Sequence, residues 1–529
     1  MKLLNSLILL STSLSHPSLA HPPSHHLCAT LPSPLISNAR ILTISSASKP
    51  ATLIPPSPPI TFSPISVPSI CEVNITLTHP GLNDTATIQI WLPLQNWNGR
   101  FLAVGGSAWV AGHFGLTQGP AVAAGFAAAS TDAGVPTNPF SPPSWALDEA
   151  GELNVGLLTN FASRSVYDLA IAGKAITESF YKRKPVAYWN GCSTGGRQGL
   201  VAAQQYPEVF DGILAGAPAI YWPEYVVAEL WPQVVMKDAG VFPPVEELDA
   251  VVAAAVAFCD ELDGVRDGIV TEPNVCAGSF DARAVIGQSY NISGKEGKIG
   301  AGAVDVVRKI WQGPNIDGQQ LWYGAPIGAA MDILANTTVS NHGKRTGLPF
   351  FVPDTWVKWF VQKDPTYAVS DIDSKALKKL FLKSQSFDDL LNNANPDLSR
   401  LQRSGTKLLV WHGGADQIIY SQGTTQYRQR VEGAMGGVDH VDEYFRYFIA
   451  PGVNHCGVGT TPAPVNALES LIKWVEKGVP PSTLTGQTSS SAPVQLTRLI
   501  CKYPLVPKYR QTGDTNSLAS YECVKGSPP

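Results

Sequence analysis

The sequence predicts an α/β fold, in which a parallel sheet is covered by helices on both faces and interrupted by one large insertion. Segments with strand character alternate with helical segments up to residue 218, the alternation stops between residues 219 and 404, and it resumes from residue 405. Alternating strands and helices are typical of a parallel sheet. The chain of 529 residues is also longer than one hydrophobic core usually allows, which favours a core with an added domain.

The first part of the core is expected to contain short strands separated by turns and helices. Residues 28–80 are rich in Pro, Ser and β-branched side chains, which indicates strands and turns at a sheet edge. Apolar residues recur at helical spacing between about residues 164 and 181, and a helix of small residues is expected to end near residue 205. The expected inner strands are residues 85–91, 101–104, 126–129, 185–189 and 212–215.

The insertion and the second part of the core differ in pattern. Residues 219–404 are expected to be irregular, with many aromatic side chains and an acidic, Gly-rich segment. The sheet is expected to resume with strands at residues 407–411 and 444–449, followed by a helix from about residue 464 to residue 477. The mature chain therefore divides into a first core segment, an inserted domain and a second core segment, at residues 21–218, 219–404 and 405–529.

The N-terminus has the pattern of a secretory signal peptide. Lys2 precedes an apolar run at residues 3–10, and a small-x-small cleavage site ends at Ala20. The run is too short to span a bilayer. Residues 1–20 are therefore predicted to be removed, so that a secreted, extracellular protein begins near His21.

Composition excludes two classes of partner and fits an extracellular protein. A formal net charge of −4 provides no basic field, so no nucleic-acid partner is expected. No later stretch reaches about 18 uninterrupted apolar residues, so no membrane anchor is expected. Four N-glycosylation sequons agree with secretion; they begin at Asn74, Asn83, Asn291 and Asn336.

The chain has eight cysteines, which in an oxidising compartment suggests four disulfides, although the sequence alone leaves 105 connectivities open. Pairing nearest neighbours along the chain leaves Cys192 and Cys456 as a long-range pair. The pairs of near neighbours are Cys28 with Cys71, Cys259 with Cys276, and Cys501 with Cys523.

The segment Gly191-Cys192-Ser193-Thr194-Gly195 has the Gly-x-Ser-x-Gly pattern of a nucleophile elbow. In such an elbow the serine lies on a strained turn between a strand and a helix, and small neighbours prevent steric conflict. A tight turn without chemistry is the alternative, but a strand is expected before this segment and a helix after it. Ser193 is therefore predicted to be the nucleophile.

A serine nucleophile needs a base and a carboxylate that orients the base. Asp416 follows the strand at residues 407–411 on a Gly-rich loop, although a simple turn aspartate is the alternative. Two histidines follow it, and His440 lies among acidic residues as a solvated side chain would. His455 follows the next strand in a loop with turn residues and is the predicted base.

The cysteines support this choice independently. Cys192 precedes Ser193, and Cys456 follows His455. If the two cysteines are bonded, their Cα atoms lie within about 4.4–6.8 Å. The predicted nucleophile and base would then be neighbours.

The predicted oxyanion hole combines two backbone N–H groups. Elbow geometry assigns the N–H of Thr194, at the start of the helix that follows the nucleophile. The turn after the strand at residues 101–104 is expected to supply the other, from Gly106.

A second group of polar residues lies at residues 259–269, where several carboxylates share a short Gly-containing loop. Their spacing differs from that of an EF-hand, but such a loop suits a hard cation that takes oxygen ligands. On the residues alone, a solvated acidic turn is the slightly favoured alternative.

The motifs together resemble the tannase and feruloyl esterase family. The resemblance rests on Cys192-Ser193, Asp416, His455-Cys456 and residues 188–197, and it extends over nearly all of the mature chain. Members of that family bridge the cysteines beside the catalytic serine and histidine. The resemblance implies an α/β-hydrolase core with a large inserted lid domain, and it implies Ca²⁺ as a structural ion in the lid, with no organic cofactor. The implied calcium ligands are the side chains of Asp260, Asp263 and Asp267 and the carbonyl groups of Val265 and Ile269.

The resemblance implies a serine carboxylic ester hydrolase that acts through an acyl-enzyme. The expected substrates are feruloyl and related hydroxycinnamoyl esters attached to plant cell-wall polysaccharide, as in xylan degradation. Lid aromatics are suited to stack on the ring of this acid or of gallate, and no single residue separates the two substrates. Tannase activity on gallate esters is the alternative. A catalytically silent, wall-binding relative is a distant alternative, because all three triad candidates are present.

Overall fold

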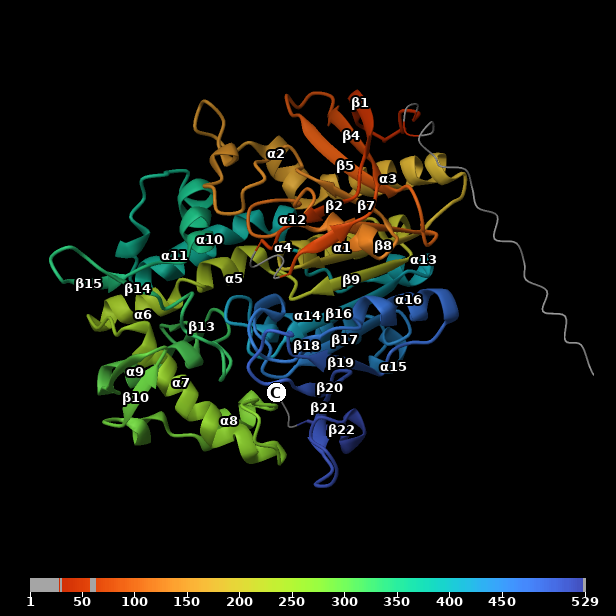
Figure 1. Ribbon diagram of the computed structural model, residues 1–529. Helices are drawn as coiled ribbons and strands as arrows, with labels where there is room; N and C mark the ends of the chain where they lie inside the picture. The colour runs from red at the N-terminus through yellow and green to blue at the C-terminus, as the bar shows by residue number, and fades with distance from the viewer. Residues whose placement is uncertain (1–27, 29–30, 58–62, 527–529) are drawn as a thin grey trace, which may run out of the picture.

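The computed structural model describes residue 28, residues 31–57 and residues 63–526 (Figure 1). The signal peptide predicted at residues 1–20 lies outside the described residues. The molecule has two lobes (Figure 1). One is built around a central sheet, and the other consists mostly of helices from the middle of the chain.

A nine-stranded sheet forms the first lobe. Its strands are β1 (Arg40–Lys49), β4 (Ile70–Thr78), β5 (Ala86–Pro93), β6 (Arg100–Val104), β7 (Ala127–Thr131), β8 (Val186–Cys192), β9 (Gly212–Gly216), β16 (Lys407–Gly413) and β17 (Phe445–Ala450). Their order in the sheet is β1-β4-β5-β7-β6-β8-β9-β16-β17. The strands from β7 to β17 run parallel, as predicted, whereas β1, β4, β5 and β7 pair antiparallel. The connection from β4 to β5 is too short for the crossover that a parallel pair needs, so the sheet is mixed.

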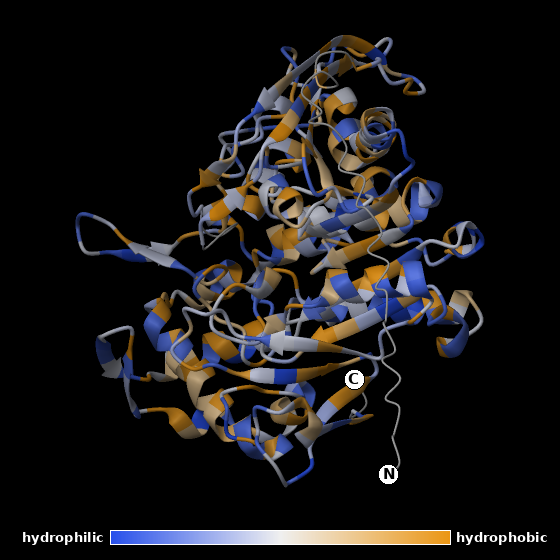
Figure 2. Ribbon diagram, turned by 45° about the vertical axis from the view of Figure 1, so that its right-hand side comes forward, coloured by the Kyte–Doolittle hydropathy of each residue, from blue (hydrophilic) through white to orange (hydrophobic). Residues whose placement is uncertain are grey.

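Helices cover both faces of the parallel part, because alternate residues of each strand enter different cores. Phe101 of β6 and Trp189 of β8 enter one core, whereas their neighbours Leu102 and Tyr188 enter the other. The first core includes α3 (Ser165–Tyr181), α4 (Thr194–Gln205) and α14 (Ser421–Ala434), and the second includes α1 (Gln118–Ala123) and α16 (Ala467–Lys477). Figure 2 shows hydrophobic residues along the central strands. The predicted sheet with helices on both faces is confirmed.

The segment between β9 and β16 is described throughout, and none of its strands joins the central sheet. Its helices are α5 (Trp222–Ala228), α6 (Trp231–Ala239), α7 (Val245–Cys259), α8 (Pro273–Ser279), α9 (Ala301–Gln312), α10 (Phe351–Thr355), α11 (Ser374–Ser384), α12 (Asp388–Leu391) and α13 (Ser399–Ser404). Three hairpins accompany them: β10 (Ser289–Ile292) with β11 (Lys295–Lys298), β12 (Asn315–Ile316) with β13 (Gln319–Gln320), and β14 (Thr337–Val339) with β15 (Arg345–Gly347).

The expectation that this segment is irregular is wrong, because much of it is helical. Helix α7 is apolar over most of its length and packs against α9, so its sequence lacks the polar face that would reveal helical periodicity. Helices α5 and α6 are short and begin with a Trp-Pro pair, in which proline occupies the first turn. Their many aromatic residues are more typical of a loop-rich segment, so the sequence did not indicate helices here.

The C-terminal part adds small sheets beside β17. One consists of β18 (Ala463–Pro464), β19 (Thr483–Gln487) and β20 (Thr497–Cys501). The other is the hairpin of β21 (Leu505–Tyr509) with β22 (Tyr521–Lys525). The remaining short strands and α-helices are β2 (Thr52–Ile54), β3 (Ile65–Val67), α2 (Val155–Thr159) and α15 (Val438–Val441).

All four predicted disulfides are confirmed, and no cysteine is free in the described chain, which contains all eight. They join Cys28 to Cys71, Cys192 to Cys456, Cys259 to Cys276, and Cys501 to Cys523.

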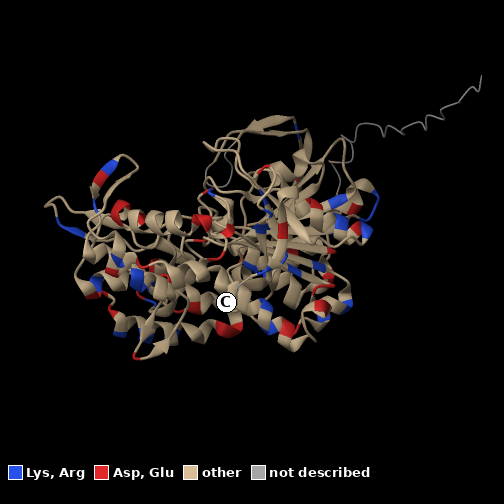
Figure 3. Cartoon of the chain, turned by 90° about the horizontal axis from the view of Figure 1, so that it is seen from below, with Lys and Arg blue, Asp and Glu red and all other residues tan. Residues whose placement is uncertain are grey.

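Charged residues of both signs are interspersed over the two lobes (Figure 3). Among the described residues, no helix combines the length and apolar character needed to cross a membrane.

Candidate active site

Ser193 lies at the turn between β8 and α4, where the sequence places a nucleophile elbow. Its backbone has φ 63° and ψ −122°, a combination that L-residues rarely adopt. A Cβ atom at Gly191 would lie 2.5 Å from the carbonyl oxygen of Gly195, so no larger residue fits there. Gly196 is equally constrained, since its Cβ would lie 2.3 Å from the carbonyl oxygen of Gly216. The sequence therefore folds into a tight strand-to-helix turn that presents the partly exposed serine.

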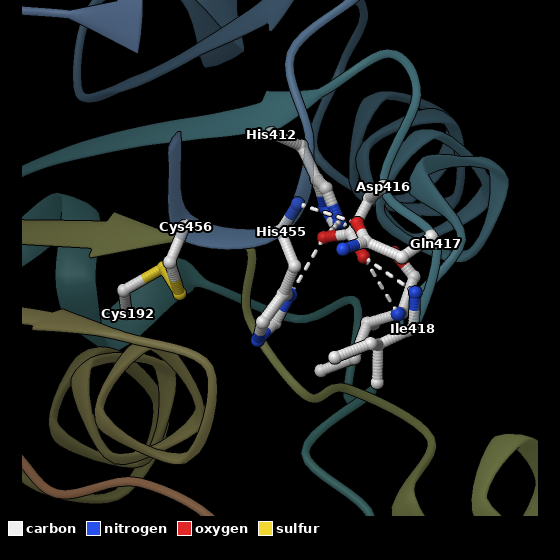
Figure 4. The surroundings of a disulfide bond; sticks show 8 residues. Cys192, His412, Asp416, Gln417, Ile418, His455 and Cys456 are labelled. Atoms are coloured by element: carbon white, nitrogen blue, oxygen red, sulfur yellow. Dashed lines mark hydrogen bonds and ion pairs between the residues drawn. A yellow bond between two sulfur atoms is a disulfide. The ribbon is translucent and has the colours of Figure 1, made fainter. Parts of the chain in front are cut away.

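Asp416 lies just after the end of β16 and is fully buried. Its Oδ1 accepts hydrogen bonds from the backbone N–H groups of Ile418 at 2.9 Å and Ile419 at 2.8 Å. Its Oδ2 lies 2.8 Å from Nδ1 of His455 (Figure 4). Burial alone would raise the pKa of Asp416, but the attraction of His455 and hydrogen bonds from His412 and His455 hold it well below its usual range. The carboxylate is thus fixed in its ionised form.

His455 lies in the loop after β17, and its backbone N–H donates to Oε1 of Gln417 at 3.0 Å. The loop approaches the end of β16 so closely that a Cβ at Gly413 would lie 2.1 Å from the carbonyl oxygen of Val453. The side chain of His455 is 14% exposed, in contrast to that of Asp416. This geometry gives the imidazole a buried carboxylate on one nitrogen and leaves the other side open.

The disulfide between Cys192 and Cys456 brings the nucleophile turn and the histidine loop together, with the two Cα atoms 5.9 Å apart (Figure 4). Ser193 and His455 are the direct sequence neighbours of these cysteines. Among the described residues, neither the Ser193 hydroxyl nor Nε2 of His455 forms a hydrogen bond. In unliganded enzymes such catalytic hydrogen bonds are often long and tighten when substrate binds.

The rejected candidate, His440, lies on α15 and is exposed. Its Nε2 is 2.7 Å from Nε2 of Gln402, and its Nδ1 is 3.9 Å from a carboxylate oxygen of Glu443. It makes no contact with Asp416. The structure therefore pairs Asp416 with the predicted histidine.

His412 is a site residue that the sequence analysis did not single out. It is fully buried on β16, and its Nε2 lies 3.1 Å from Oδ2 of Asp416 (Figure 4). The four-residue spacing from Asp416, across two glycines, was visible in the sequence. A histidine inside a buried strand is, however, also compatible with a purely structural role.

The two predicted oxyanion donors differ in the structure. The N–H of Thr194, in the first turn of α4, has no hydrogen-bond partner within the described chain. The N–H of Gly106 donates instead to Oε1 of Gln198 at 3.0 Å. The carbonyl of Gly106 accepts from the N–H of Gly195 at 3.0 Å. Gly106 therefore ties its turn to α4, and its N–H is already used in this structure.

Aromatic side chains must be exposed to stack on a substrate, but some of the aromatic residues of the insertion are buried. Trp222 and Trp356 are 1% and 0% exposed and belong to one buried cluster with Trp109. The Trp109 ring packs at 5.3 Å from the Trp222 ring and at 6.2 Å from the Trp356 ring. Trp109 lies in the turn that contains Gly106, so this cluster joins the insertion to the site as a structural core.

The acidic loop follows α7 and packs against the C-terminal part of the chain. Asp267 forms an ion pair with Nε of Arg498 at 2.6 Å. Burial raises the pKa of Asp267 to about 6 in spite of this ion pair, and the neighbouring Asp263 and Asp260 add to the rise. A cavity of about 20 Å³ borders Asp263, Asp267 and Ile269 and has room for one small occupant.

The carboxylates of this loop are mainly bonded to its own backbone. Oδ1 of Asp260 accepts from three N–H groups between residues 267 and 269, and Oδ1 of Asp263 accepts from Val265 at 3.0 Å. Within the described chain, no three His, Cys, Asp or Glu side chains converge as a metal centre. A cation in the small cavity beside Asp263 and Asp267 would therefore also need backbone oxygens as ligands.

The four sequons differ in exposure. Asn83 and Asn291 are exposed, whereas Asn74 and Asn336 are partly buried. The side chain of Asn74 accepts a hydrogen bond from Gln89 at 3.1 Å within the sheet.

Comparison with known proteins relates the chain to one family throughout. A family model described as tannase and feruloyl esterase matches residues 71–524. A probable feruloyl esterase of Arthroderma benhamiae is 44% identical over 532 residues, which cover 99% of this chain and 98% of that protein. The tannase of Aspergillus oryzae is 27% identical over 86% of this chain and 84% of its own length. The solved structure of tannin acyl hydrolase from Aspergillus niger is 25% identical, with a TM-score of 0.85 and coverage of 95% of each chain.

Proposed function

The chain belongs to the tannase and feruloyl esterase family and is a carboxylic ester hydrolase, and from that premise we propose that it cleaves hydroxycinnamoyl esters with Ser193 as the nucleophile. One observation carries the proposal. The Cys192–Cys456 disulfide holds the elbow serine beside a histidine that is hydrogen-bonded to a buried carboxylate. That arrangement has the parts of a Ser-His-Asp triad, in the chain order of an α/β-hydrolase.

The proposed mechanism is acyl transfer in two steps. Nε2 of His455 accepts the proton of the Ser193 hydroxyl while the Ser193 oxygen attacks the ester carbonyl. His455 then gives that proton to the departing alcohol. Water, deprotonated by the same nitrogen, attacks the acyl-enzyme, and that proton passes to the Ser193 oxygen as the acid leaves. The ionised Asp416 holds Nδ1–H of His455 and stabilises the imidazolium that forms in each step.

The oxyanion of each tetrahedral intermediate needs donors that are fixed in advance. The unpaired N–H of Thr194 is the proposed first donor, and its position at the start of α4 adds the positive end of the helix dipole. The turn that contains Gly106 is the proposed source of the second donor, held in place by the Gln198 side chain.

The proposed acyl group is feruloyl or a related hydroxycinnamoyl group on plant cell-wall polysaccharide. Support comes from the Arthroderma benhamiae relative, whose name is probable feruloyl esterase and whose identity of 44% exceeds the 27% of the Aspergillus oryzae tannase. A soluble, secreted enzyme is the proposed form, since all eight cysteines are paired and two sequons are exposed.

A structural calcium ion is proposed for the acidic loop of the lid, outside the chemistry. Asp260, Asp263 and Asp267 would supply carboxylate oxygens, and Val265 and Ile269 would supply carbonyl oxygens. The small cavity that Asp263, Asp267 and Ile269 line supports this proposal. The ion would fix the loop against the C-terminal segment that contains Arg498.

Release of acid from methyl ferulate and methyl gallate, measured side by side, tests the proposed function. We expect a higher kcat/KM on the ferulate ester and no activity for Ser193→Ala on either ester. A preference for the gallate ester would identify the protein as a tannase. A folded wild-type protein that releases neither acid would contradict the proposal and favour a silent, wall-binding relative.

A further inference from the structure

The ring of His412 is held by three groups behind the triad carboxylate. It belongs to β16, and its strand neighbour across the sheet is Ile449 of β17. Nε2 lies 3.1 Å from Oδ2 of Asp416 and 2.8 Å from the carbonyl oxygen of Ile419. Nδ1 lies 2.9 Å from the hydroxyl of Thr424, on α14. The side chain is 0% exposed, so water does not compete for these contacts.

The partners of the ring define its tautomer. Both groups beside Nε2 are acceptors, a carboxylate and a carbonyl, so this nitrogen is the one that is protonated. The hydroxyl beside Nδ1 can donate its hydrogen to an unprotonated nitrogen. With its proton on Nε2, His412 shares this N–H between the carbonyl of Ile419 and Oδ2 of Asp416, while the hydroxyl of Thr424 donates to Nδ1 and maintains this tautomer.

His412 completes a balanced set of hydrogen bonds around the carboxylate. Oδ1 of Asp416 accepts two backbone N–H groups, and Oδ2 accepts Nδ1–H of His455 and Nε2–H of His412 (Figure 4). Without His412, Oδ2 would have His455 as its one donor. The carboxylate would keep its two backbone donors and His455, but Oδ2 would be held less firmly, and the orientation of the imidazole of His455 would be less well defined.

We infer that His412 is a positioning residue, which holds Oδ2 of Asp416 in line with Nδ1 of His455 through its own Nε2–H. This inference rests on the proposed function, because it concerns the same triad. It assigns His412 no contact with substrate. Its effect should therefore fall on kcat, which depends on the orientation of the base, and KM should change little.

Two substitutions of His412 distinguish the role of its hydrogen-bond donor from that of the imidazole ring as a whole. Gln at position 412 places an amide N–H near the position of Nε2, whereas Leu removes every donor from a similar volume. We expect His412→Leu to lower kcat about 10- to 100-fold, as loss of a hydrogen bond to a charged group does. His412→Gln should keep kcat within about threefold of the wild type, and both variants should keep KM within about twofold.

Thr424→Val tests the same series of hydrogen bonds at the contact between Thr424 and Nδ1 of His412. This variant remains informative if His412→Leu fails to fold. The valine variant should lower kcat by a smaller factor, since the tautomer is then no longer fixed. Combining Thr424→Val with His412→Leu should add no further loss, because both act through the same hydrogen bond to Asp416. His440→Gln, at an exposed histidine outside the site, is the matched control and should match the wild type.

The outcomes distinguish this inference from the proposed function. A wild-type protein that releases no acid, or an Asp416→Asn variant as active as wild type, overturns the proposed function. An active wild type with an inactive Asp416→Asn variant and a folded His412→Leu variant of unchanged kcat overturns the inference alone. The inference is also overturned if His412→Gln loses as much kcat as His412→Leu, or if Thr424→Val leaves kcat unchanged.

Discussion

The Cα atoms of Cys192 and Cys456 lie 5.9 Å apart, and the disulfide between them joins the residue before Ser193 to the residue after His455. The bond joins two loops that are separated by 264 residues in the sequence. It therefore keeps the loops of Ser193 and His455 next to each other, in addition to the constraint that the sheet provides.

Removal of this disulfide is predicted to lower both stability and catalysis. In Cys192→Ser/Cys456→Ser we expect the free energy of unfolding to fall by about 2–5 kcal/mol. We also expect kcat/KM on methyl ferulate to fall about 100-fold at a temperature where the variant is folded, since small displacements of reacting groups are costly. Cys28→Ser/Cys71→Ser is the control, because this disulfide lies at the edge of the sheet and should affect stability alone. Equal kcat/KM in the two double variants would contradict the prediction.

Gln198 is predicted to support catalysis by holding the oxyanion turn. Its side chain accepts from the N–H of Gly106 and donates to the carbonyl of Ala111, both at 3.0 Å. Gln198→Leu leaves these two buried groups unpaired, so we expect a loss of about 1–3 kcal/mol for each in unfolding experiments. We also expect a lower kcat at unchanged KM. A stable variant with wild-type kcat would show that the turn keeps its position without this side chain.

His79 is predicted to stabilise the fold in a pH-dependent way. Its Nδ1 lies 2.6 Å from Asp84 and its Nε2 lies 3.0 Å from Asp168, all three being buried. Burial alone would lower the pKa of His79, but hydrogen bonds and attraction to Asp168 and Asp84 outweigh it and raise the pKa. Burial also raises the pKa of Asp168, which weakens its attraction for a protonated His79. Because the carboxylates of both Asp84 and Asp168 face the ring, the protonated form of His79 is still favoured.

A raised folded-state pKa of a histidine stabilises the protein below the unfolded-state pKa, and this contribution is lost as the pH rises through the folded-state value. The difference in free energy of unfolding between wild type and His79→Gln should therefore be largest near pH 5 and shrink towards pH 9. Denaturant unfolding at several pH values measures it. His342→Gln, at an exposed histidine, serves as the control. A difference that grows with pH would show that His79 is neutral in the folded protein.

Removal of calcium is predicted to lower thermal stability and leave the chemistry intact. Treatment with a chelator should lower Tm, and added Ca²⁺ should restore it, because a ligand that binds the folded state stabilises it. Asp263→Asn should give the same lower Tm with no response to Ca²⁺. The value of kcat at a temperature well below both transitions should not change. A Tm that is independent of chelator and of Ca²⁺ would contradict a calcium site.

Much of the geometry of the candidate active site could be predicted from the sequence, because local constraints determine it. The elbow requires Gly191 for steric reasons, and cysteines beside Ser193 and His455 predict a bond that the structure contains. The parallel strands were recognisable as short apolar runs that end in glycine or small residues. The pairing of Asp416 with His455 then followed from the order of the strands.

Other features depend on contacts between distant segments, which no local pattern reveals. The N–H of Gly106 is taken up by a side chain 92 positions later in the chain. The helix α7 shows little periodicity because even exposed positions such as Phe258 are apolar, and its packing against α9 is determined by the fold of the lobe. The role of His412 depends on Thr424 and on the loop at Ile419, which the fold alone brings to the ring.

The central claim is that Ser193 is the nucleophile activated by His455 and Asp416. The most direct test is to label the nucleophile with a serine-directed fluorophosphonate, which forms a stable analogue of the acyl-enzyme. Peptide mass spectrometry then locates the adduct. We predict one adduct, on Ser193, that forms in parallel with loss of ferulate release and much more slowly in His455→Ala. An adduct on another residue, or full ester hydrolysis by a folded Ser193→Ala variant, would contradict the claim.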